Sequence, residues 1–477
     1  MKNTRIVFIL IILVLSVSFL SATIINIPED YNQIQIGINV STDGDTILVQ
    51  PGTYYENINF NGHNITVCSL FLTTQDSFYI EQTIIDGSQE GRVVTFETNE
   101  NSTASLTGFT LKNGNVYGPT YPENRGGGIS IDSSSPTLTN LIVASNQAVA
   151  AGGISFWDNA NATLDHVIVE DNYSYDNSGG IHISNSYPTI SNSIIKNNFA
   201  SSKSGGIGFS SSSPTLTNTL IVNNTAGDKG GAMYLSSEAW PIMVNVTICN
   251  NSSAWSAIHC DTGSRPNLIN CILWNNSPDE ILFDNGDAIV ISYSNVRNGW
   301  GGTGNINEYP LFTGTGNNQY SLQEASPCVD AGIPNTSGLM LPPWDLIGNL
   351  RIWDGDGNGI ANIDMGAYEY GSLPYVDVNY NAIIQPLDFS LFQNYPNPFN
   401  PSTTISFNIS SELNDNAVVS IFNLKGQLIK TYSINSGQTS ITWNGEDEFE
   451  KTVTSGIYLY KLNVGNKFFT KKMILLK

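Results

Sequence analysis

A repeat of 25 to 27 residues constrains the fold of this chain more than any other feature of its sequence. Each copy starts with a glycine pair and an apolar residue, at Gly127-Gly128-Ile129, Gly152-Gly153-Ile154, Gly179-Gly180-Ile181, Gly205-Gly206-Ile207 and Gly230-Gly231-Ala232, with a degenerate copy at Ser256-Ala257-Ile258. An apolar run ending in Asn recurs later in the copies, at Asn146, Asn198 and Asn224. One copy holds only short strands and cannot bury its own apolar side, so the copies must stack.

Such stacking predicts an all-β protein built on a right-handed parallel β-helix, in which each strand gains a parallel neighbour at ~4.8 Å. We expect the glycine pairs to form sharp corners with positive φ and the recurrent Asn to form a hydrogen-bonded ladder. The period does not suit propeller blades, and the spacing of leucine-rich repeats is absent. About eleven coils fit between residues 44 and 330. The segment 30–40 is expected to form a helix that covers the open end, with Asp30 and Gln33 as a capping box.

The first 22 residues have the features of a signal peptide. Lys2 and Arg5 precede an apolar run from Ile6 to Leu20, and Ser21-Ala22 offers small residues, which places the expected cleavage near Ala22. The run is short for a membrane span and no other long apolar run follows, so no transmembrane span is expected in the mature chain.

Charge is distributed unevenly along the chain. Eight of the 19 Lys and Arg but only six of the 41 Asp and Glu lie in residues 391–477, so residues 1–390 carry a net charge of −24. An acidic body argues against nucleic acid as a partner, because phosphates attract a basic surface. The simplest interpretation of the acidity is solubility.

Three segments connect the repeat region to a known scaffold. The segment 44–54 (GDTILVQPGTY) resembles the opening of bacterial pectin-lyase-like β-helix proteins, and the segments 326–332 (SPCVDAG) and 364–369 (DMGAYE) resemble motifs that close many of them. The resemblance covers residues 24–370 and predicts a β-helix domain over 23–370. It does not specify an activity, because the scaffold hosts lyases, hydrolases, esterases, adhesins and binding proteins.

The C-terminal part carries a different set of motifs. Residues 371–390 have the composition of a linker. Beyond it, the segments 394–405, 421–427, 456–460 and 471–477 resemble, in family order, the type IX secretion sorting domain. The resemblance implies that residues 391–477 form a small antiparallel Ig-like sandwich that engages the type IX secretion machinery, and that the protein crosses the outer membrane to the cell surface or beyond. A carbohydrate-binding sandwich or a fibronectin-like spacer is the alternative.

A glycine-rich acidic segment predicts a calcium loop. Asp354, Asp356, Asn358 and the Ile360 carbonyl have the alternate spacing of the first half of such a loop. The twelfth position is Met365 instead of Glu, and Asp364 is the expected substitute. The ion would be structural, and an Asx-rich turn without metal is the alternative.

Candidate catalytic and glycan-binding residues are less specific. Asp132 and Asp158 follow their glycine pairs at similar distances, which predicts two carboxylates ~5 Å apart on neighbouring coils. The alternative is that this position of the repeat is occupied by small polar turn residues without a catalytic role. Five aromatic residues fall in or beside predicted turns, where their rings could stack on sugars or shield the core: Trp157, Tyr173, Tyr175, Phe199 and Trp255. His182 and His259 look isolated, and the five cysteines are expected to be buried thiols, with one bridge among Cys249, Cys260 and Cys271 as the alternative.

These observations favour a non-catalytic surface protein that binds a polysaccharide or another cell. A polysaccharide lyase or glycoside hydrolase is the first alternative, and a structural surface repeat is the second. No nucleophile motif and no lyase signature is visible in the sequence.

Overall fold

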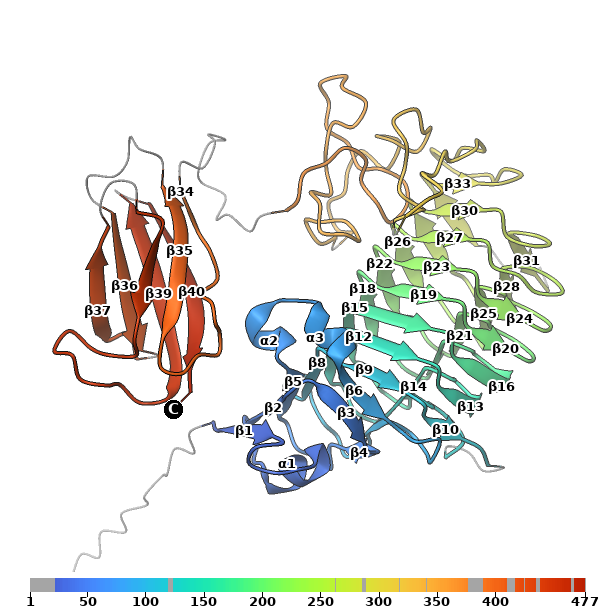
Figure 1. Cartoon of the computed structure of the whole chain (residues 1–477). Coiled ribbons are helices and arrows are strands. Elements are labelled where there is room, and N and C mark those ends of the chain that lie inside the picture. The colour runs from blue at the N-terminus through green and yellow to red at the C-terminus, as the bar shows by residue number, and fades with distance from the viewer. Residues whose placement is uncertain are drawn as a thin grey trace, which may run out of the picture.

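The computed structural model describes residues 22–118, 123–261, 263–284, 289–316, 318–339, 341–375, 389–409, 417–423, 425–434, 438–464 and 467–476. The predicted signal peptide up to residue 21 and most of the predicted linker lie outside these ranges. The described chain forms a parallel β-solenoid of about 10 turns, followed by a small domain of antiparallel sheets (Figure 1). The predicted parallel β-helix is therefore confirmed. No helix within the described ranges is long and apolar enough to cross a membrane.

Sheet A, the largest sheet of the solenoid, has two strand positions in each complete coil. Its strands are β1 (Ile24–Ile27), β2 (Thr46–Val49), β3 (Gly52–Tyr55), β5 (Thr66–Ser69), β6 (Thr83–Asp86), β8 (Ser105–Thr107), β9 (Thr110–Lys112), β12 (Thr137–Ala144), β15 (Thr163–Glu170), β18 (Thr189–Ser191), β19 (Ile194–Lys196), β22 (Thr215–Thr217), β23 (Leu220–Val222), β26 (Ile242–Val244), β27 (Thr247–Cys249), β29 (Asn267–Ile269), β30 (Ile272–Trp274), β32 (Val290–Ser292) and β33 (Asn295–Val296).

Two further sheets complete the coils. Sheet B contains β4 (Ile58–Asn59), β7 (Val94–Phe96), β11 (Ile129–Asp132), β14 (Ile154–Trp157), β17 (Ile181–Ser184), β21 (Ile207–Ser210), β25 (Met233–Ser236), β28 (Ile258–Cys260) and β31 (Ile281–Phe283). Sheet C contains β10 (Asn115–Val116), β13 (Gln147–Ala150), β16 (Tyr173–Asn177), β20 (Phe199–Ala200) and β24 (Thr225–Ala226). One apolar cluster runs through the interior from Ile27 to Val296, as a continuous solenoid core requires.

The glycine pairs mainly serve close packing, and among them only Gly230 has a positive φ (72°), so the prediction of positive φ is wrong for the other pairs. A Cβ on Gly180 would lie 2.6 Å from the Gly206 carbonyl oxygen, and a Cβ on Gly153 would lie 2.5 Å from the Gly180 carbonyl oxygen. The left-handed corners are made by other residues, such as Asn192 (φ 47°) and Asn197 (φ 57°). Asn tolerates this region better than most residues, which explains why it recurs at the corners.

The predicted asparagine ladder is present inside the coils. The Asn198 Nδ2 donates to Asn224 Oδ1 at 2.9 Å and to the Val169 carbonyl, while its Oδ1 accepts from the Asn172 backbone N–H and Nδ2. The same pattern continues to Asn276, whose amide donates to Glu280, and Arg297 lies 2.8 Å from that carboxylate. The ladder therefore ends on an ion pair, which satisfies its last amide.

The N-terminal end of the solenoid is covered by α1 (Ile34–Val40), as predicted. The predicted capping box is wrong, because Gln33 makes no side-chain cap hydrogen bond and the Asp30 carboxylate accepts from the Asn26 backbone N–H. The carboxylate of Glu56 caps the helix instead, accepting from the N–H groups of Ile34 and Gln35. Glu56 belongs to the next coil, so this cap depends on the tertiary fold.

The outer face of sheet A is covered near both ends. Near the N-terminus, α2 (Phe71–Thr74) and α3 (Phe78–Gln82) pack on the outward side chains of the first coils. Near the C-terminus, the closing segment 309–375 packs Tyr320, Leu346 and Tyr368 against Leu220 and Cys249. Among the described residues the last solenoid strand ends at Val296, and the solenoid has about 10 turns, close to the eleven expected. All five cysteines are buried free thiols.

The C-terminal domain consists of two antiparallel sheets that share one core. One sheet contains β34 (Phe389–Leu391), β35 (Thr403–Ile409) and β38 (Ser440–Trp443), and the other contains β37 (Leu428–Ser433), β36 (Ala417–Asn423), β39 (Gly456–Val464) and β40 (Lys467–Leu475). Ile405 and Trp443 from the first sheet pack with Ile421 and Tyr460 from the second. This arrangement is consistent with the predicted β-sandwich.

Candidate ligand-binding groove

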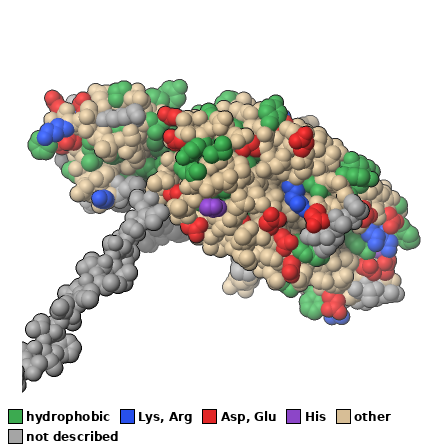
Figure 2. All heavy atoms as spheres, turned by 90° about the horizontal axis from the view of Figure 1, so that it is seen from below, with side chains coloured by type: hydrophobic (Ala, Val, Ile, Leu, Met, Phe, Trp, Pro, Cys, Tyr) green, Lys and Arg blue, Asp and Glu red, His purple; other side chains and the backbone are tan. Residues whose placement is uncertain are grey.

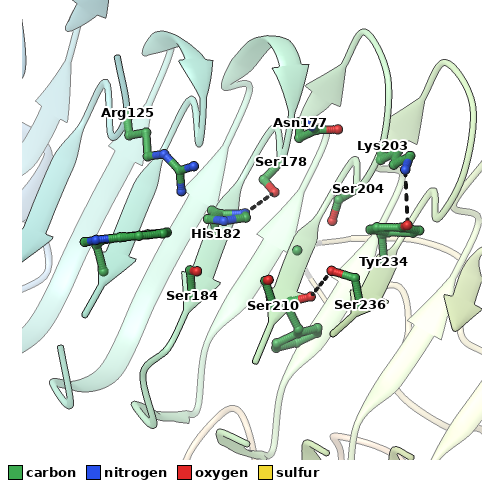
Figure 3. Close-up of a pocket in the computed structure, with 13 residues that line it drawn as sticks. Arg125, Asn177, Ser178, His182, Ser184, Lys203, Ser204, Ser210, Tyr234 and Ser236 are labelled. Carbon is green, nitrogen blue, oxygen red and sulfur yellow. Dashed lines mark hydrogen bonds between the residues drawn. The ribbon is translucent and has the colours of Figure 1, made fainter. Parts of the chain in front are cut away.

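A groove of functional interest runs along the outer face of sheet B. In each coil the second residue of the sheet-B strand points outward, and the parallel register aligns these residues into one column. The column contains Ser155, His182, Gly208, Tyr234 and His259. Turns between sheets C and B form one wall, which carries Arg125, Ser178, Lys203 and Ser204 (Figure 3). The groove contains a pocket of about 300 Å³ that extends from Arg125 and Trp157 to Tyr234 and Ser236.

At one end of the groove, a cation covers an aromatic ring. The guanidinium carbon of Arg125 lies 4.6 Å from the centre of the Trp157 ring. The next coil contributes His182, whose Nδ1 lies 3.0 Å from Ser178 Oγ. Burial, together with the positive charge of Arg125, lowers the pKa of His182 to about 3. His182 is therefore a neutral imidazole at physiological pH, and it can donate or accept a hydrogen bond toward the groove.

Tyr234 connects the centre of the groove to a chain of charged side chains. Its hydroxyl accepts from Lys203 Nζ at 3.1 Å and donates to Asp261 Oδ2 at 2.9 Å. Burial, followed by the hydrogen bond to Asp261, raises the pKa of Tyr234. The Tyr234 ring stacks on His259 with centroids 5.9 Å apart. Tyr234 is therefore a neutral, fixed polar surface of the groove.

The far end of the groove is held by an ion-pair cluster. The Asp284 carboxylate accepts from Lys229 Nζ at 2.9 Å and lies 3.0 Å from His259 Nε2. Lys229 also lies 5.5 Å from the centre of the Trp255 ring, which is 51% exposed. The hydrogen bond from Lys229 lowers the pKa of Asp284, so the carboxylate remains charged. This cluster fixes Trp255 at the rim as an exposed ring.

A serine, a histidine and an aspartate meet in this cluster without forming a hydrolytic triad. Ser256 Oγ lies 3.5 Å from His259 Nδ1, but it is fully buried and donates to the Ile258 carbonyl. A nucleophile must reach its substrate, and this hydroxyl cannot. His182 and His259 stand in the same outward column but are separated by Gly208 and Tyr234, so the two histidines do not form a pair.

The two acidic catalytic candidates do not stack. Asp132 pairs in register with Trp157, and Asp158 is the following residue, with a positive φ of 46°. The Asp158 carboxylate accepts from Asn185 Nδ2 at 2.8 Å. The predicted pair of carboxylates is therefore wrong, because the two residues differ by one position and their side chains leave the coil in different directions.

The five aromatic candidates divide into two groups. Trp157 and Trp255 border the sheet-B groove, whereas Tyr173, Tyr175 and Phe199 gather on the outer face of sheet C. There, Tyr173 stacks on Phe199 at 5.3 Å with an interplanar angle of 14°, and Tyr117, which is 79% exposed, contacts Tyr175. We call the second group the sheet-C patch. The two groups lie on different sheets of the solenoid.

The predicted calcium loop lies near the end of the closing segment. Carboxylate oxygens of Asp354 and Asp356 lie within 4.8 Å of one another and of Asp330, which the sequence prediction did not include. Asp364 is wrongly placed in the prediction, because it is buried and accepts from the backbone N–H groups of Asp330 and Tyr370. Asn358 accepts from the Ile360 backbone N–H, and Ile360 is exposed. The loop therefore offers three carboxylates that could hold a cation.

Comparison with known proteins identifies the C-terminal domain. Residues 393–476 match the family of secretion system C-terminal sorting domains. No curated protein matches the chain.

Three solved structures share some similarity with the chain. PorZ, a surface component of the type IX secretion system of Porphyromonas gingivalis, is 22% identical over 18% of this chain and 11% of its own, with a TM-score of 0.15. Latent PorU of the same organism is 20% identical over 26% of this chain and 11% of its own, with a TM-score of 0.17. A pectin methylesterase mutant in complex with a hexasaccharide is 8% identical over 51% of this chain and 80% of its own, with a TM-score of 0.30. The chain thus spans about a tenth of PorZ and PorU.

The fold defines the solenoid and the C-terminal domain, and the family match identifies the C-terminal domain. Residues 393–476 belong to the secretion system C-terminal sorting domains, and the chain is an exported parallel β-helix protein that type IX secretion directs across the outer membrane to the cell surface or the extracellular space.

Proposed function

We propose that the β-helix is a non-catalytic glycan-binding module displayed outside the cell. The observation that supports this proposal is the sheet-B groove, in which aromatic rings, hydroxyl groups and cations alternate along the coil axis. Five coils contribute to its column of outward residues, which gives it a length of about 19 Å. An elongated groove of this kind suits an elongated ligand with a repeating structure.

The side chains in the groove have the chemistry that sugars require. A pyranose offers an apolar face to an aromatic ring and hydroxyl groups to polar side chains. Trp157 and Trp255 supply rings at the two ends, and Tyr234, whose ring contacts Lys203 and His259, supplies a hydroxyl group between them. Ser184, Ser210 and Ser236 line the floor beside them (Figure 3). Most of these groups are held by neighbouring side chains, so binding would require little ordering.

The sheet-C patch is a weaker candidate for the same ligand. Its stacked rings of Tyr173 and Phe199 cover each other's faces, which leaves mainly edges for contact. The hydroxyl groups of Tyr173 and Tyr175 are already bonded to Ser201 and Gln147. The groove is therefore the preferred site.

A lyase or hydrolase is the alternative function. Asp132 and Asp158 do not face each other, and Ser178 and Ser256 are buried. Tyr234, with a raised pKa, is a poor base at neutral pH. These observations favour binding without turnover.

A glycan array probed with the full-length protein tests the proposal. We expect binding to a defined set of glycans, and we expect Trp157→Ala to weaken it at least about tenfold, because an aromatic stacking contact contributes more than about 1.4 kcal/mol. The matched control Phe199→Ala in the sheet-C patch should bind as the wild type does. Bound glycans are then incubated with the protein and assayed for unsaturated uronates and new reducing ends. Product formation would replace the binding proposal with the enzymatic one.

We further propose that Asp330, Asp354 and Asp356 hold a structural calcium ion. Their oxygens converge, and the Asp354 Oδ1 is buried without a hydrogen-bond partner among the described residues. Calcium prefers carboxylate and carbonyl oxygens, and exposed Gly357 and Gly359 allow the loop to wrap around an ion. The ion would stabilise the closing segment and would take no part in glycan binding.

A further inference from the structure

A second pocket, separate from the groove on sheet B, lies between the last coils of sheet A and the closing segment. Its volume is about 380 Å³, within the range of about 300–1,000 Å³ that is usual for small-ligand pockets. Cys249 and Trp274 occupy equivalent positions on neighbouring coils, and each is followed by a corner residue with positive φ, Asn250 or Asn275. The closing segment, which folds back beside these coils (Figure 1), buries Cys249 but leaves Trp274 partly exposed. The pocket therefore forms where this cover ends.

Two pairs of aromatic rings form the apolar part of this pocket. The rings of Trp274 and Tyr309 meet at 68° with centroids 6.1 Å apart, and those of Phe312 and Tyr320 meet at 81° with centroids 5.6 Å apart. Tyr309 is 62% exposed and Tyr320 is buried, so the rings extend from the rim of the pocket to its floor. In an edge-to-face pair, the ring that contributes its edge keeps both faces uncovered by its partner. Ring faces are therefore available to an apolar surface of a ligand.

Amide side chains form the polar part of the same pocket. The Asn250 Nδ2 donates to the Tyr320 hydroxyl at 2.9 Å, and the Asn250 Oδ1 accepts from Asn275 Nδ2 at 2.6 Å. These bonds fix the two amides before a ligand arrives, so binding would require little ordering. The Asn275 Oδ1, the Gln319 amide and the Tyr309 hydroxyl form no hydrogen bond with other described residues. Donors and acceptors therefore remain for a ligand.

The described residues that line this pocket include no charged side chain. Cys249 is a neutral thiol, because burial raises its pKa to about 12. Acidic side chains lie at many places on the face of the molecule in Figure 2, and residues 1–390 carry a net charge of −24, so a pocket wall without carboxylates is a local exception. A charged ligand would lose its water here without gaining a partner of opposite charge. The pocket therefore favours an uncharged ligand.

We propose that this pocket is a second carbohydrate-binding site, which takes one uncharged pyranose unit. A pyranose places its apolar face on an aromatic ring and directs its hydroxyl groups to amides. Trp274 and Tyr309 supply the rings, and Asn275 and Gln319 supply the hydrogen bonds. The pocket and the sheet-B groove have no lining residue in common, so this site goes beyond the proposed function and does not depend on it.

Calorimetry with two matched pairs of monosaccharides tests the ligand class. The pairs are methyl glucoside with methyl glucuronide and methyl galactoside with methyl galacturonide, and the protein is the full-length Trp157→Ala variant, in which the sheet-B groove is weakened. We expect at least one neutral sugar to bind in the millimolar range, and its acidic counterpart to bind at least about threefold more weakly, because the carboxylate finds no cation. Tighter binding of the acidic sugars, or no binding of either neutral sugar, would overturn the proposal.

Two further changes in the same variant locate the binding in the pocket. Tyr309→Ala removes an exposed ring and Gln319→Ala removes an exposed amide, and neither side chain belongs to the solenoid core. Each change should weaken the neutral sugar at least about threefold. The matched control Tyr55→Ala, which removes a 71% exposed ring from β3, should leave the affinity unchanged. Unchanged affinity in folded Tyr309→Ala would overturn the assignment.

The outcomes separate this inference from the proposed function. Array binding that is independent of Trp157, together with neutral sugar binding that requires Tyr309, would refute the sheet-B groove and keep the pocket. Array binding that requires Trp157, with no sugar bound by the Trp157→Ala variant, would keep the groove and refute the pocket. Binding that depends on neither residue would refute both.

Discussion

At the scale of single residues, two kinds of glycine differ in what surrounds them in the coils. The paired glycines lie where neighbouring coils approach most closely, and Gly208 lies beneath the side chains of Ser178, His182 and Ser204. Backbone oxygens surround the first kind, so a side chain has no space, whereas side-chain oxygens and a ring nitrogen surround the second. A side chain at the first kind would therefore press on backbone of the next coil, whereas one at the second would displace side chains of the groove.

We predict that Gly180→Ala destabilises the β-helix by about 1–3 kcal/mol, because the added methyl group overpacks the coil contact. Its Cβ would lie 2.6 Å from a carbonyl oxygen of the next coil, and backbone cannot move aside cheaply. Gly301→Ala is the matched control, because a Cβ there meets nothing within 4 Å. Urea unfolding followed by circular dichroism measures both variants. Equal stability of the two would show that the coil contact tolerates a side chain.

His182 should make stability depend on pH. Its folded pKa of about 3 lies below the ordinary value of ~6.5, so folding favours the neutral ring. The stabilisation is present above pH 6.5 and is lost as the pH falls from 6.5 toward 3. His182→Gln should therefore flatten the decline of unfolding free energy between pH 6.5 and 4. Parallel declines in the wild type and the variant would contradict this assignment.

At the scale of elements, the sequence repeat predicts the coils well and the groove poorly. The glycine pairs and the recurrent Asn locate the strands and the ladder, because both patterns are imposed by contacts between equivalent positions. The register, however, aligns Met233 with Ile207, so Gly231 and Ala232 correspond to the earlier glycine pair. If this copy of the repeat is aligned on Gly230-Gly231, it is shifted by one residue, and Tyr234 no longer falls in the same outward column as His182. Aligning the buried apolar residues would have placed His182, Tyr234 and His259 together.

Contacts between distant segments could not be predicted from local patterns. Glu56 caps α1 from the next coil, and Asp330 joins the acidic loop from a separate turn. Asp364, although close to the loop in sequence, is drawn into the interior by two backbone N–H groups. Spacing rules describe ligands that belong to one loop, and the fold decides which other side chains reach it.

Calcium should raise the melting temperature of the protein, because an ion that binds only the folded closing segment stabilises it by mass action. Magnesium should have a smaller effect, because it requires a tighter octahedral shell. Asp330→Asn and Asp356→Ala should each remove the difference, whereas Asp279→Asn, at an exposed site elsewhere, should keep it. Identical melting curves in millimolar calcium and in chelator would show that the loop is a turn without an ion.

At the scale of the whole molecule, the two parts have separate tasks. The C-terminal sandwich has its own core and a local net charge of +2, and the acidic β-helix carries the groove. With the proposed function, delivery and ligand recognition are encoded in different domains, and they should respond to different changes.

Removal of residues 391–477 should leave the protein in the periplasm of its native host, because the sorting domain directs passage across the outer membrane. Cell fractionation and protease treatment of intact cells measure the location. The variant Trp157→Ala, altered only in the groove, should still be exported. Surface exposure of the truncated protein would show that another segment directs export.

The central claim, that a glycan lies along sheet B, is tested most directly by hydroxyl-radical footprinting of the full-length protein with and without a glycan identified on the array. The rings at the groove should be shielded by the ligand, and those of the sheet-C patch should not. We predict that the oxidation of Trp157, Tyr234 and Trp255 decreases on binding, while that of Tyr175 and Phe199 stays constant. Protection of Tyr175 and Phe199 with unchanged oxidation of Trp157 and Trp255 would contradict the account.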